Sequence, residues 1–264
     1  SGGGVLRYIA GTETLRATST SVDPNSFAGA LILALSLAVS QLFARRPILP
    51  RVAIAACAIL TGAAVLLSYS RGSWLAFAVA FVFIVVLRYR RAWPLLVLAA
   101  ASFYFFPIGG DFTAHLESGI HVQDQAAAMR LGEFKDAFRL IGQYPWFGVG
   151  FSDAPSIDLY LGVSNLYLLI AEVMGLLGLA AFLAVVIAFF VHSLRSYRHV
   201  RDQQLKGIMA GLLGGVVAAL AAGMFDHYFF NIDFPHMVAL FWLFVGLTMA
   251  AVRIGRSGSD ASSG

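Results

Sequence analysis

The sequence predicts an all-α membrane protein with about seven transmembrane helices and a large extracytoplasmic loop that contains an amphipathic helix. Two observations lead to this fold class. Of the 264 residues, 59% are hydrophobic and 12% are charged, and soluble domains carry about twice that share of charge. The apolar residues also form long blocks, as expected for helices that need about 20 residues to cross a bilayer. The single cysteine, Cys57, lies inside one block, which argues against a disulfide framework or a cysteine-based metal site.

Seven apolar blocks are predicted to cross the membrane. The third and fourth are short and have flanking aromatic residues, whereas the fifth is long enough to tilt or to continue beyond the bilayer. The sixth carries Gly207, Gly211 and Gly215 at four-residue spacing, a pattern typical of closely packed helices. In chain order the blocks are Phe27–Ala44, Val52–Tyr69, Trp74–Leu87, Trp93–Ile108, Asn165–Val191, Gly207–Phe225 and Phe234–Val252.

The charges of the loops predict the orientation. On one side of the membrane the loops and tail hold twelve Lys and Arg residues against two acids. The other side has six Lys and Arg residues against the remaining twelve acids, counting Glu172 of the fifth span with this side. In membrane proteins the loops richer in positive charge face the cytoplasm. We therefore expect four segments outside the cytoplasm: the N-terminal segment, the Ser70-Arg71-Gly72 turn, the 109–164 insert and the Asp226–Asp233 loop.

These assignments divide the chain into five parts. Because residues 1–26 begin outside the membrane with no preceding span, we expect the chain to be the C-terminal part of a longer protein. The Gly/Ser-rich end is typical of a disordered tail. The parts are an extracytoplasmic lead-in segment (1–26), transmembrane helices 1–4 (27–108), an extracytoplasmic loop that acts as a lid (109–164), transmembrane helices 5–7 (165–252) and a disordered cytoplasmic tail (253–264).

Polar residues stand at the outer ends of the first three spans. Asp23 is expected to cap the first helix, with Pro24 at the first helical position. Asn25 either belongs to this cap or faces a polar cleft. Arg71, in the short turn between the second and third spans, has two interpretations. It either extends to lipid phosphate or offers its planar fork of donors to a diphosphate.

The long insert contains a predicted amphipathic helix over residues 126–141. This helix is expected to lie against the membrane or against other helices. Arg130 borders its apolar stripe and therefore points toward the protein or the interface, unless it simply pairs with Glu133 three residues later. The apolar residues that recur at helical spacing are Ala127, Leu131, Phe134, Phe138 and Ile141.

Two further groups of residues suggest chemistry. Asn165 and Glu172 are seven residues apart and share a helix face, with Glu172 about 10 Å further along the axis. An ionisable residue in a membrane span is expensive to bury and is a functional candidate, although it can also form a structural pair with an arginine. Asp226 and His227 are adjacent in an outer loop, where they either supply a general base or serve in loop hydrogen bonds and capping.

The order of these motifs is similar to that of the O-antigen ligase and O-antigen polymerase family of bacterial membrane glycosyltransferases. The resemblance covers nearly the whole chain, as the C-terminal core of the family. It rests on Asp23-Pro24-Asn25, Ser70-Arg71-Gly72, an outer arginine ahead of Pro145-Trp146-Phe147-Gly148-Val149-Gly150, Asn165-Leu166-Tyr167-Leu168 followed by Glu172, Gly175 and Gly178, and Phe241-Trp242 followed by Gly246-Leu247.

The resemblance implies a metal-independent GT-C-like enzyme without a cofactor, in the bacterial inner membrane with its active face on the periplasmic side. Such enzymes move a glycan from undecaprenyl diphosphate to a hydroxyl of a glycan or lipid acceptor. The expected partners are this donor, the acceptor and the lipid bilayer, with no nucleic acid. By position, the resemblance implies that Arg71 and Arg130 hold the diphosphate. It also implies that Asn165 lies in the acceptor pocket and that Glu172 supports Asn165 from below.

The chain departs from the family pattern at Ser164. Members of the ligase branch carry a histidine here as the proposed base, and a serine cannot replace imidazole in that role at neutral pH. Either His227 or Asp226 substitutes, or another group acts. Ser164 also keeps a second function class open, a non-catalytic protein that binds lipid-linked glycans. A transporter is a third, but transporters line a path to both faces with polar residues, whereas here the polar residues gather outside.

Overall fold

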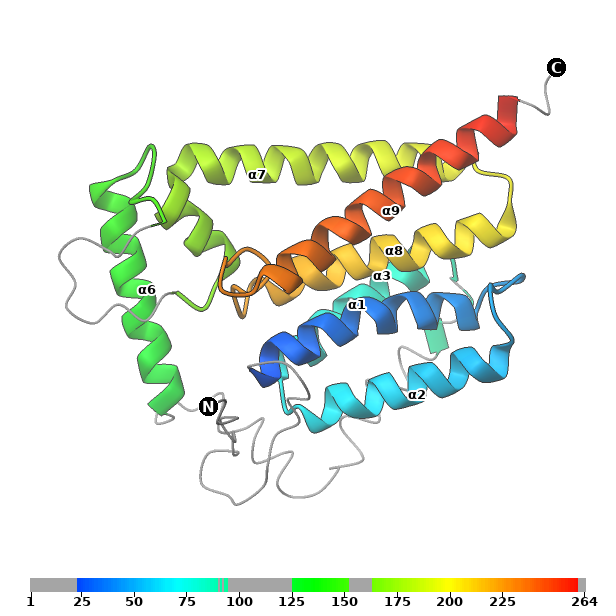
Figure 1. The fold of residues 1–264 in the computed structure, drawn as a ribbon, viewed down its shortest axis with the longest axis horizontal. Helices are drawn as coiled ribbons and strands as arrows, with labels where there is room; N and C mark the ends of the chain where they lie inside the picture. The colour runs from blue at the N-terminus through cyan, green and yellow to red at the C-terminus, as the bar shows by residue number, and fades with distance from the viewer. Residues whose placement is uncertain (1–22, 90, 92, 95–124, 152–162, 261–264) are drawn as a thin grey trace. The chain divides into compact units, whose positions relative to one another are not determined.

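The computed structural model describes residues 23–89, 91, 93–94, 125–151 and 163–260, and within this part of the chain it contains helices and no strand. The all-α prediction is therefore confirmed for the described residues. The helices are α1 (Pro24–Leu42), α2 (Arg51–Leu67), α3 (Arg71–Leu87), α6 (Gln125–Gln143), α7 (Leu166–His199), α8 (Gln203–Ala222) and α9 (Pro235–Asp260) (Figure 1).

Four of these helices are long and apolar enough to cross a membrane, judged by length and composition. They are α1, α7, α8 and the Pro235–Ser257 part of α9. Helices α2 and α3 are also apolar but have 17 residues each, the lower limit for a span. Residues 95–108 of the predicted fourth span lie outside the described residues. The fold is thus that of a helical membrane protein, and seven spans remain a prediction.

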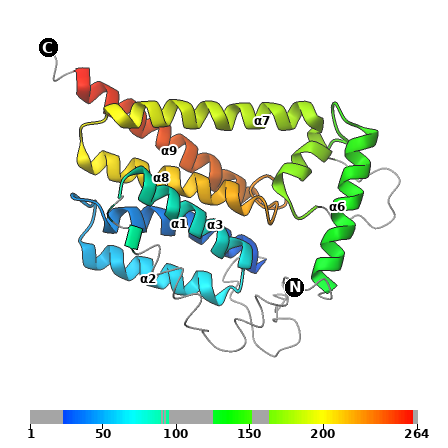
Figure 2. The ribbon, with the colours of Figure 1, turned by 180° about the vertical axis from the view of Figure 1, so that it is seen from behind.

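The chain divides into two compact units. Unit 1 contains α1, α2, α3, α8, α9 and the end of α7 from Val185 onward. Unit 2 contains α6, the part of α7 up to Ala184 and the short segment Met224–His227. Within unit 1, α8 packs against α1, α3 and α9, and α1 lies between α8 and α2 (Figures 1 and 2).

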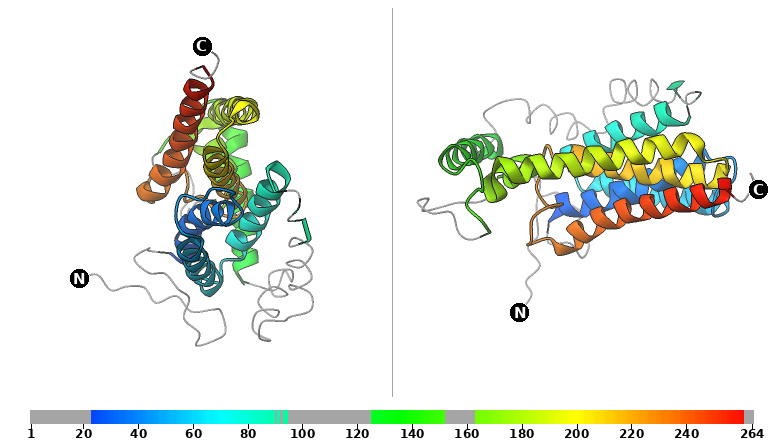
Figure 3. Two further views of the ribbon diagram at one scale, coloured as in Figure 1. Left: turned by 90° about the vertical axis from the view of Figure 1, so that its right-hand side faces the viewer. Right: turned by 90° about the horizontal axis from the view of Figure 1, so that it is seen from above.

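Close packing around α8 depends on its glycines, as their spacing predicts. A Cβ atom on Gly211 would lie 2.8 Å from the Cα of Leu37 on α1, and one on Gly215 would lie 2.6 Å from the Phe244 ring of α9. Neighbouring backbones can approach this closely only where side chains are absent. The end-on view shows how near the axes of these helices come (Figure 3, left).

Helix α3 has one buried face and one exposed face, and the exposed face is also apolar. Ala76, Ala80 and Ile84 are fully buried, at 0% exposure. The exposed face carries large apolar side chains at helical spacing: Leu75, Val79, Val82 and Val86. A soluble bundle would place polar residues on that face, so this pattern suits a helix that meets lipid.

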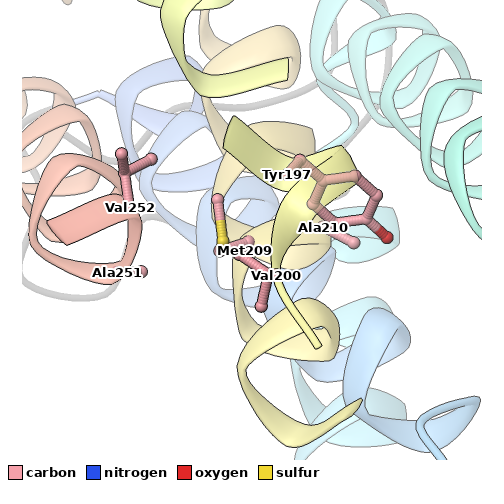
Figure 4. Packing of buried hydrophobic residues seen from close by; sticks show 6 residues of the cluster. All are labelled: Tyr197, Val200, Met209, Ala210, Ala251 and Val252. Carbon is pink, nitrogen blue, oxygen red and sulfur yellow. The ribbon is translucent and has the colours of Figure 1, made fainter. Parts of the chain in front are cut away.

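The last helix extends beyond its predicted end. The sequence predicts a disordered tail after Val252, but α9 continues to Asp260, and that prediction is wrong for the described part of the tail. Arg256 donates a hydrogen bond to the Ser196 hydroxyl at 3.1 Å. A hydrophobic cluster from α7, α8 and α9 holds the same end of unit 1 (Figure 4): Tyr197, Val200, Met209, Ala210, Ala251 and Val252. Packing therefore overrides the weak helix propensity of the Gly/Ser-rich sequence.

We predict that Gly211→Ala destabilises the protein by about 1–3 kcal/mol, because the added methyl group meets the α1 backbone. The matched control is Gly62→Ala on α2, where an added Cβ would meet nothing within 4 Å. That change should leave stability unchanged or raise it by up to about 1 kcal/mol. Thermal unfolding of the purified protein in detergent measures both. Equal melting temperatures for the two variants would show that α8 packs differently.

Candidate functional site

Helix α7 is broken at Gly175. The backbone there has φ 71° and ψ 180°, which is not helical. A short first segment from Leu166 to Met174 therefore precedes the long apolar remainder, and the two segments run in different directions (Figure 1). This corrects the expectation of one continuous span from Asn165 to Val191. Glu172 belongs to the short segment before the break and not to the long apolar helix.

The backbone of the turn that follows α6 forms hydrogen bonds with α7 on both sides of this break. The amides of Val149 and Gly150 donate to the carbonyl oxygens of Glu172 and Val173, at 2.8 and 2.9 Å. In return, the amide of Leu176 donates to the carbonyl oxygen of Pro145 at 2.7 Å. In an unbroken helix, the carbonyls of Glu172 and Val173 would accept from amides four residues further on. The turn thus replaces hydrogen bonds that the break removes.

Two glycines make this joint possible. Gly148 and Gly175 both have positive φ, 68° and 71°, a region that side chains disfavour. A Cβ atom on Gly148 would collide with the carbonyl oxygen of Glu172, and one on Gly175 would collide with the carbonyl oxygen of Trp146. Each glycine therefore makes room for the backbone of the other segment.

Glu172 is buried next to this joint, with 2% of its surface exposed. Its backbone carbonyl is one of the groups that hold the turn. A carboxyl group is rarely buried so completely unless it has partners or a function. This burial agrees with the argument from the sequence, in which a buried ionisable residue is a functional candidate. The catalytic role of Glu172 remains a prediction.

Asn165 caps the first turn of α7. Its Oδ1 accepts hydrogen bonds from the amides of Tyr167 and Leu168, both at 3.0 Å, as an N-cap residue does. Its Nδ2 donates to the carbonyl oxygen of Met224 at 3.0 Å. Asn165 therefore ties the start of α7 to the segment Met224–His227.

Asp226 and His227 form a pair at the end of that segment. Asp226 Oδ1 lies 3.2 Å from His227 Nδ1, and the two side chains are 17% and 20% exposed. The same oxygen also accepts a hydrogen bond from the His227 amide at 2.8 Å. The adjacency in sequence therefore becomes a contact between a carboxylate and an imidazole, which still reaches solvent.

The backbone of Ser164 is hydrogen-bonded to Glu133, a residue for which the sequence suggests only a pairing with Arg130. The amide of Ser164 donates to Glu133 Oε2 at 3.0 Å. Glu133 lies on α6, 31 residues earlier, so no local pattern indicates this contact. It links α6 directly to the start of α7 within unit 2.

The proposed substrate-binding residues are divided between the two units. Arg130 lies within α6 in unit 2. Arg71 is the first residue of α3, and Asn25 lies in the first turn of α1, both in unit 1. Asp23 caps α1 as expected, because its Oδ2 accepts from the amides of Asn25 and Ser26 at 2.9 and 3.0 Å.

The predicted helix over residues 126–141 is confirmed as part of α6. Its predicted apolar stripe, however, is not the buried face of the helix. Leu131 and Phe138 are 51% and 63% exposed. The residues that face inward are Ala137 and Leu140, at 0% and 1% exposure. The buried positions thus lie beside the predicted apolar stripe and do not coincide with it.

One comparison with known families finds a match. Residues 55–183 match the family model described as O-antigen ligase. This range includes Arg71, Arg130, Ser164, Asn165 and Glu172 and ends before the Asp226–His227 pair. No curated protein sequence matches the chain. The family resemblance expected from the motifs is therefore confirmed over residues 55–183.

We predict that Gly175→Ala disrupts the joint between the turn and α7 and costs about 1–3 kcal/mol of stability. The added Cβ would collide with the backbone of the turn, and alanine disfavours the positive φ of this position. Gly132→Ala on α6, where an added Cβ meets nothing within 4 Å, is the control. Hydrogen exchange at the Val149 and Gly150 amides provides a local measurement. Faster exchange is expected in Gly175→Ala alone, and unchanged protection in that variant would contradict the assigned hydrogen bonds.

Proposed function

Because residues 55–183 match the family model described as O-antigen ligase, we propose that the chain transfers an undecaprenyl-diphosphate-linked glycan onto an acceptor hydroxyl. The acceptor is a glycan or a lipid, and the product is a surface polysaccharide, by ligation or polymerisation. The reaction takes place at the periplasmic face of the bacterial inner membrane. The family match carries this proposal, because its range contains five of the residues expected to contact or support the substrates.

The chemistry requires charge stabilisation and one proton acceptor. The acceptor oxygen attacks the anomeric carbon of the donor sugar, and the bond from that carbon to the diphosphate oxygen breaks. The diphosphate leaves with the electron pair of this bond, and a base takes the proton of the acceptor hydroxyl. Fixed positive charges that face the leaving group lower the barrier of such a step. Arginines can supply this charge, so the proposed mechanism is independent of metal.

Arg71 suits the leaving group because of where it stands in unit 1. It is the first residue of α3, where the helix N-terminus itself favours anions. The N-cap Ser70 makes no side-chain hydrogen bond to the first-turn amides; its hydroxyl bonds Ser73 Oγ at 3.0 Å instead. Arg71 thus adds a planar set of donors to a helix end that no side chain caps. Arg130, on α6, is the proposed second diphosphate ligand.

His227 is the proposed base, and Asp226 orients it. In this proposal His227 carries its ring proton on Nδ1, toward Asp226 Oδ1, which lies 3.2 Å away. Nε2 is then the nitrogen that can accept a proton from the acceptor hydroxyl. The second N–H of the Asn165 amide group would bind the acceptor, and buried Glu172 would support that end of α7. Ser164 would contact substrate without acting as the base.

We predict that Arg71→Ala and Arg130→Ala each lower transfer by about 100- to 1,000-fold, as expected when a group that stabilises the leaving charge is removed. The control is Arg139→Ala, which removes an exposed cation from the same helix as Arg130. Release of diphosphate from polyprenyl-linked glycan in proteoliposomes measures the rate. Full activity in both variants would reject the diphosphate assignment, and wild-type binding without any release would identify a non-catalytic glycan-lipid-binding protein.

We also predict that His227→Ala lowers kcat by about 100- to 10,000-fold, the range for loss of a general acid–base group. Asp226→Asn should lower it less, because the imidazole remains. His236→Ala, at an exposed position near the start of α9, should have no effect. Single-turnover transfer rates compare the three variants. An unchanged rate in His227→Ala would assign the proton transfer to another group.

A further inference from the structure

The hydrogen bond from Ser164 to Glu133 is the start of a continuous path through unit 2. Glu133 Oε2 accepts from the Ser164 amide at 3.0 Å. The next residue, Asn165, caps α7 and donates from Nδ2 to the carbonyl oxygen of Met224 at 3.0 Å. Two residues further on, Asp226 Oδ1 accepts a hydrogen bond from the His227 amide and lies 3.2 Å from His227 Nδ1. Helix α6 is thereby connected to the Asp226–His227 pair through hydrogen bonds and short pieces of backbone.

The same helix carries a proposed ligand of the leaving group. Arg130 and Glu133 are three residues apart on α6, one helical turn. The Glu133–Ser164 bond therefore constrains where the backbone of α6 next to Arg130 lies relative to the start of α7, which carries Asn165. A transfer reaction is sensitive to this placement, because a misplacement of about 1 Å can lower the rate about 100-fold.

Glu133 acts as a hydrogen-bond acceptor at the start of α7. Its Oε2 accepts the amide N–H of Ser164, the residue just before the Asn165 cap. The contact joins a side chain of α6 to the backbone that precedes the first turn of α7. Glu133 is also only partly buried, so the bond does not leave an uncompensated charge in the core.

We propose that Glu133 is a positioning residue for glycan transfer, which holds α6 in register with the start of α7. This inference rests on the proposed function, because only a transfer reaction gives meaning to the spacing between Arg130 and the Asp226–His227 pair. Glu133 acts through Ser164 and Asn165 and touches neither substrate.

The test compares Glu133→Ala with Glu133→Gln in the full chain. Gln keeps an oxygen that accepts the Ser164 amide, whereas Ala removes it. We expect Ala to lower kcat about 10- to 100-fold, with the KM for the donor changed less than threefold, and Gln to keep at least half of the wild-type kcat. The control is Asp136→Ala, which removes a carboxylate from the next turn of α6 and should leave kcat unchanged.

A second measurement is independent of activity. Hydrogen exchange of the peptide that contains Ser164 should be about tenfold faster in Glu133→Ala, and unchanged in Glu133→Gln and Asp136→Ala. Two results would overturn the proposal: full activity in Glu133→Ala despite faster exchange, or loss of activity in Glu133→Gln despite normal exchange. The second would indicate proton transfer by Glu133. Absence of transfer in the wild-type protein would reject the proposed function, while the exchange data would still report on the Glu133 bond.

Discussion

Unit 2 depends on an exchange of backbone hydrogen bonds between the turn after α6 and the break in α7. A helix that stops at Gly175 leaves carbonyl and amide groups without their usual partners, and such groups are costly inside a membrane protein. Pro145, Val149 and Gly150 replace those partners from outside the helix. Because the bonds are reciprocal, the break and the turn each supply hydrogen-bond partners that the other lacks. The fold thus obtains a bend where a buried carboxyl group, Glu172, can lie beside the joint.

The other contacts of unit 2 extend from this bend. The short first segment of α7 presents its N-terminus, where Asn165 caps the helix and binds Met224. Glu133 binds the amide of Ser164 from α6. Two independent contacts, the turn at one end of the short segment and Glu133 at the other, therefore fix α6 against α7. The proposed base, His227, and the proposed diphosphate ligand, Arg130, thus belong to elements that these hydrogen bonds join within unit 2.

Some features of the structure could be predicted from local patterns in the sequence, and others could not. The Asp23 cap, the helix over residues 126–141 and the glycine packing of α8 follow from short-range rules of capping, periodicity and small-residue spacing. Asn165 before an apolar run is also a readable cap signal, although it attracts attention first as a polar group. The break at Gly175 is different, because a single glycine in an apolar stretch does not reveal its φ angle. The Glu133–Ser164 bond and the helical end of α9 depend on tertiary contacts, which no local rule contains.

The joint at Gly175 is made almost entirely of main-chain atoms, so it does not depend on which side chains the turn carries. The side chains of Trp146 and Phe147 are 64% and 79% exposed, and neither contributes a donor or acceptor to the three exchanged bonds. Evolution can therefore replace these exposed side chains without dismantling the bend. Only the glycines are fixed by geometry. The outer surface of the turn can thus change its chemistry while the path of the backbone stays the same.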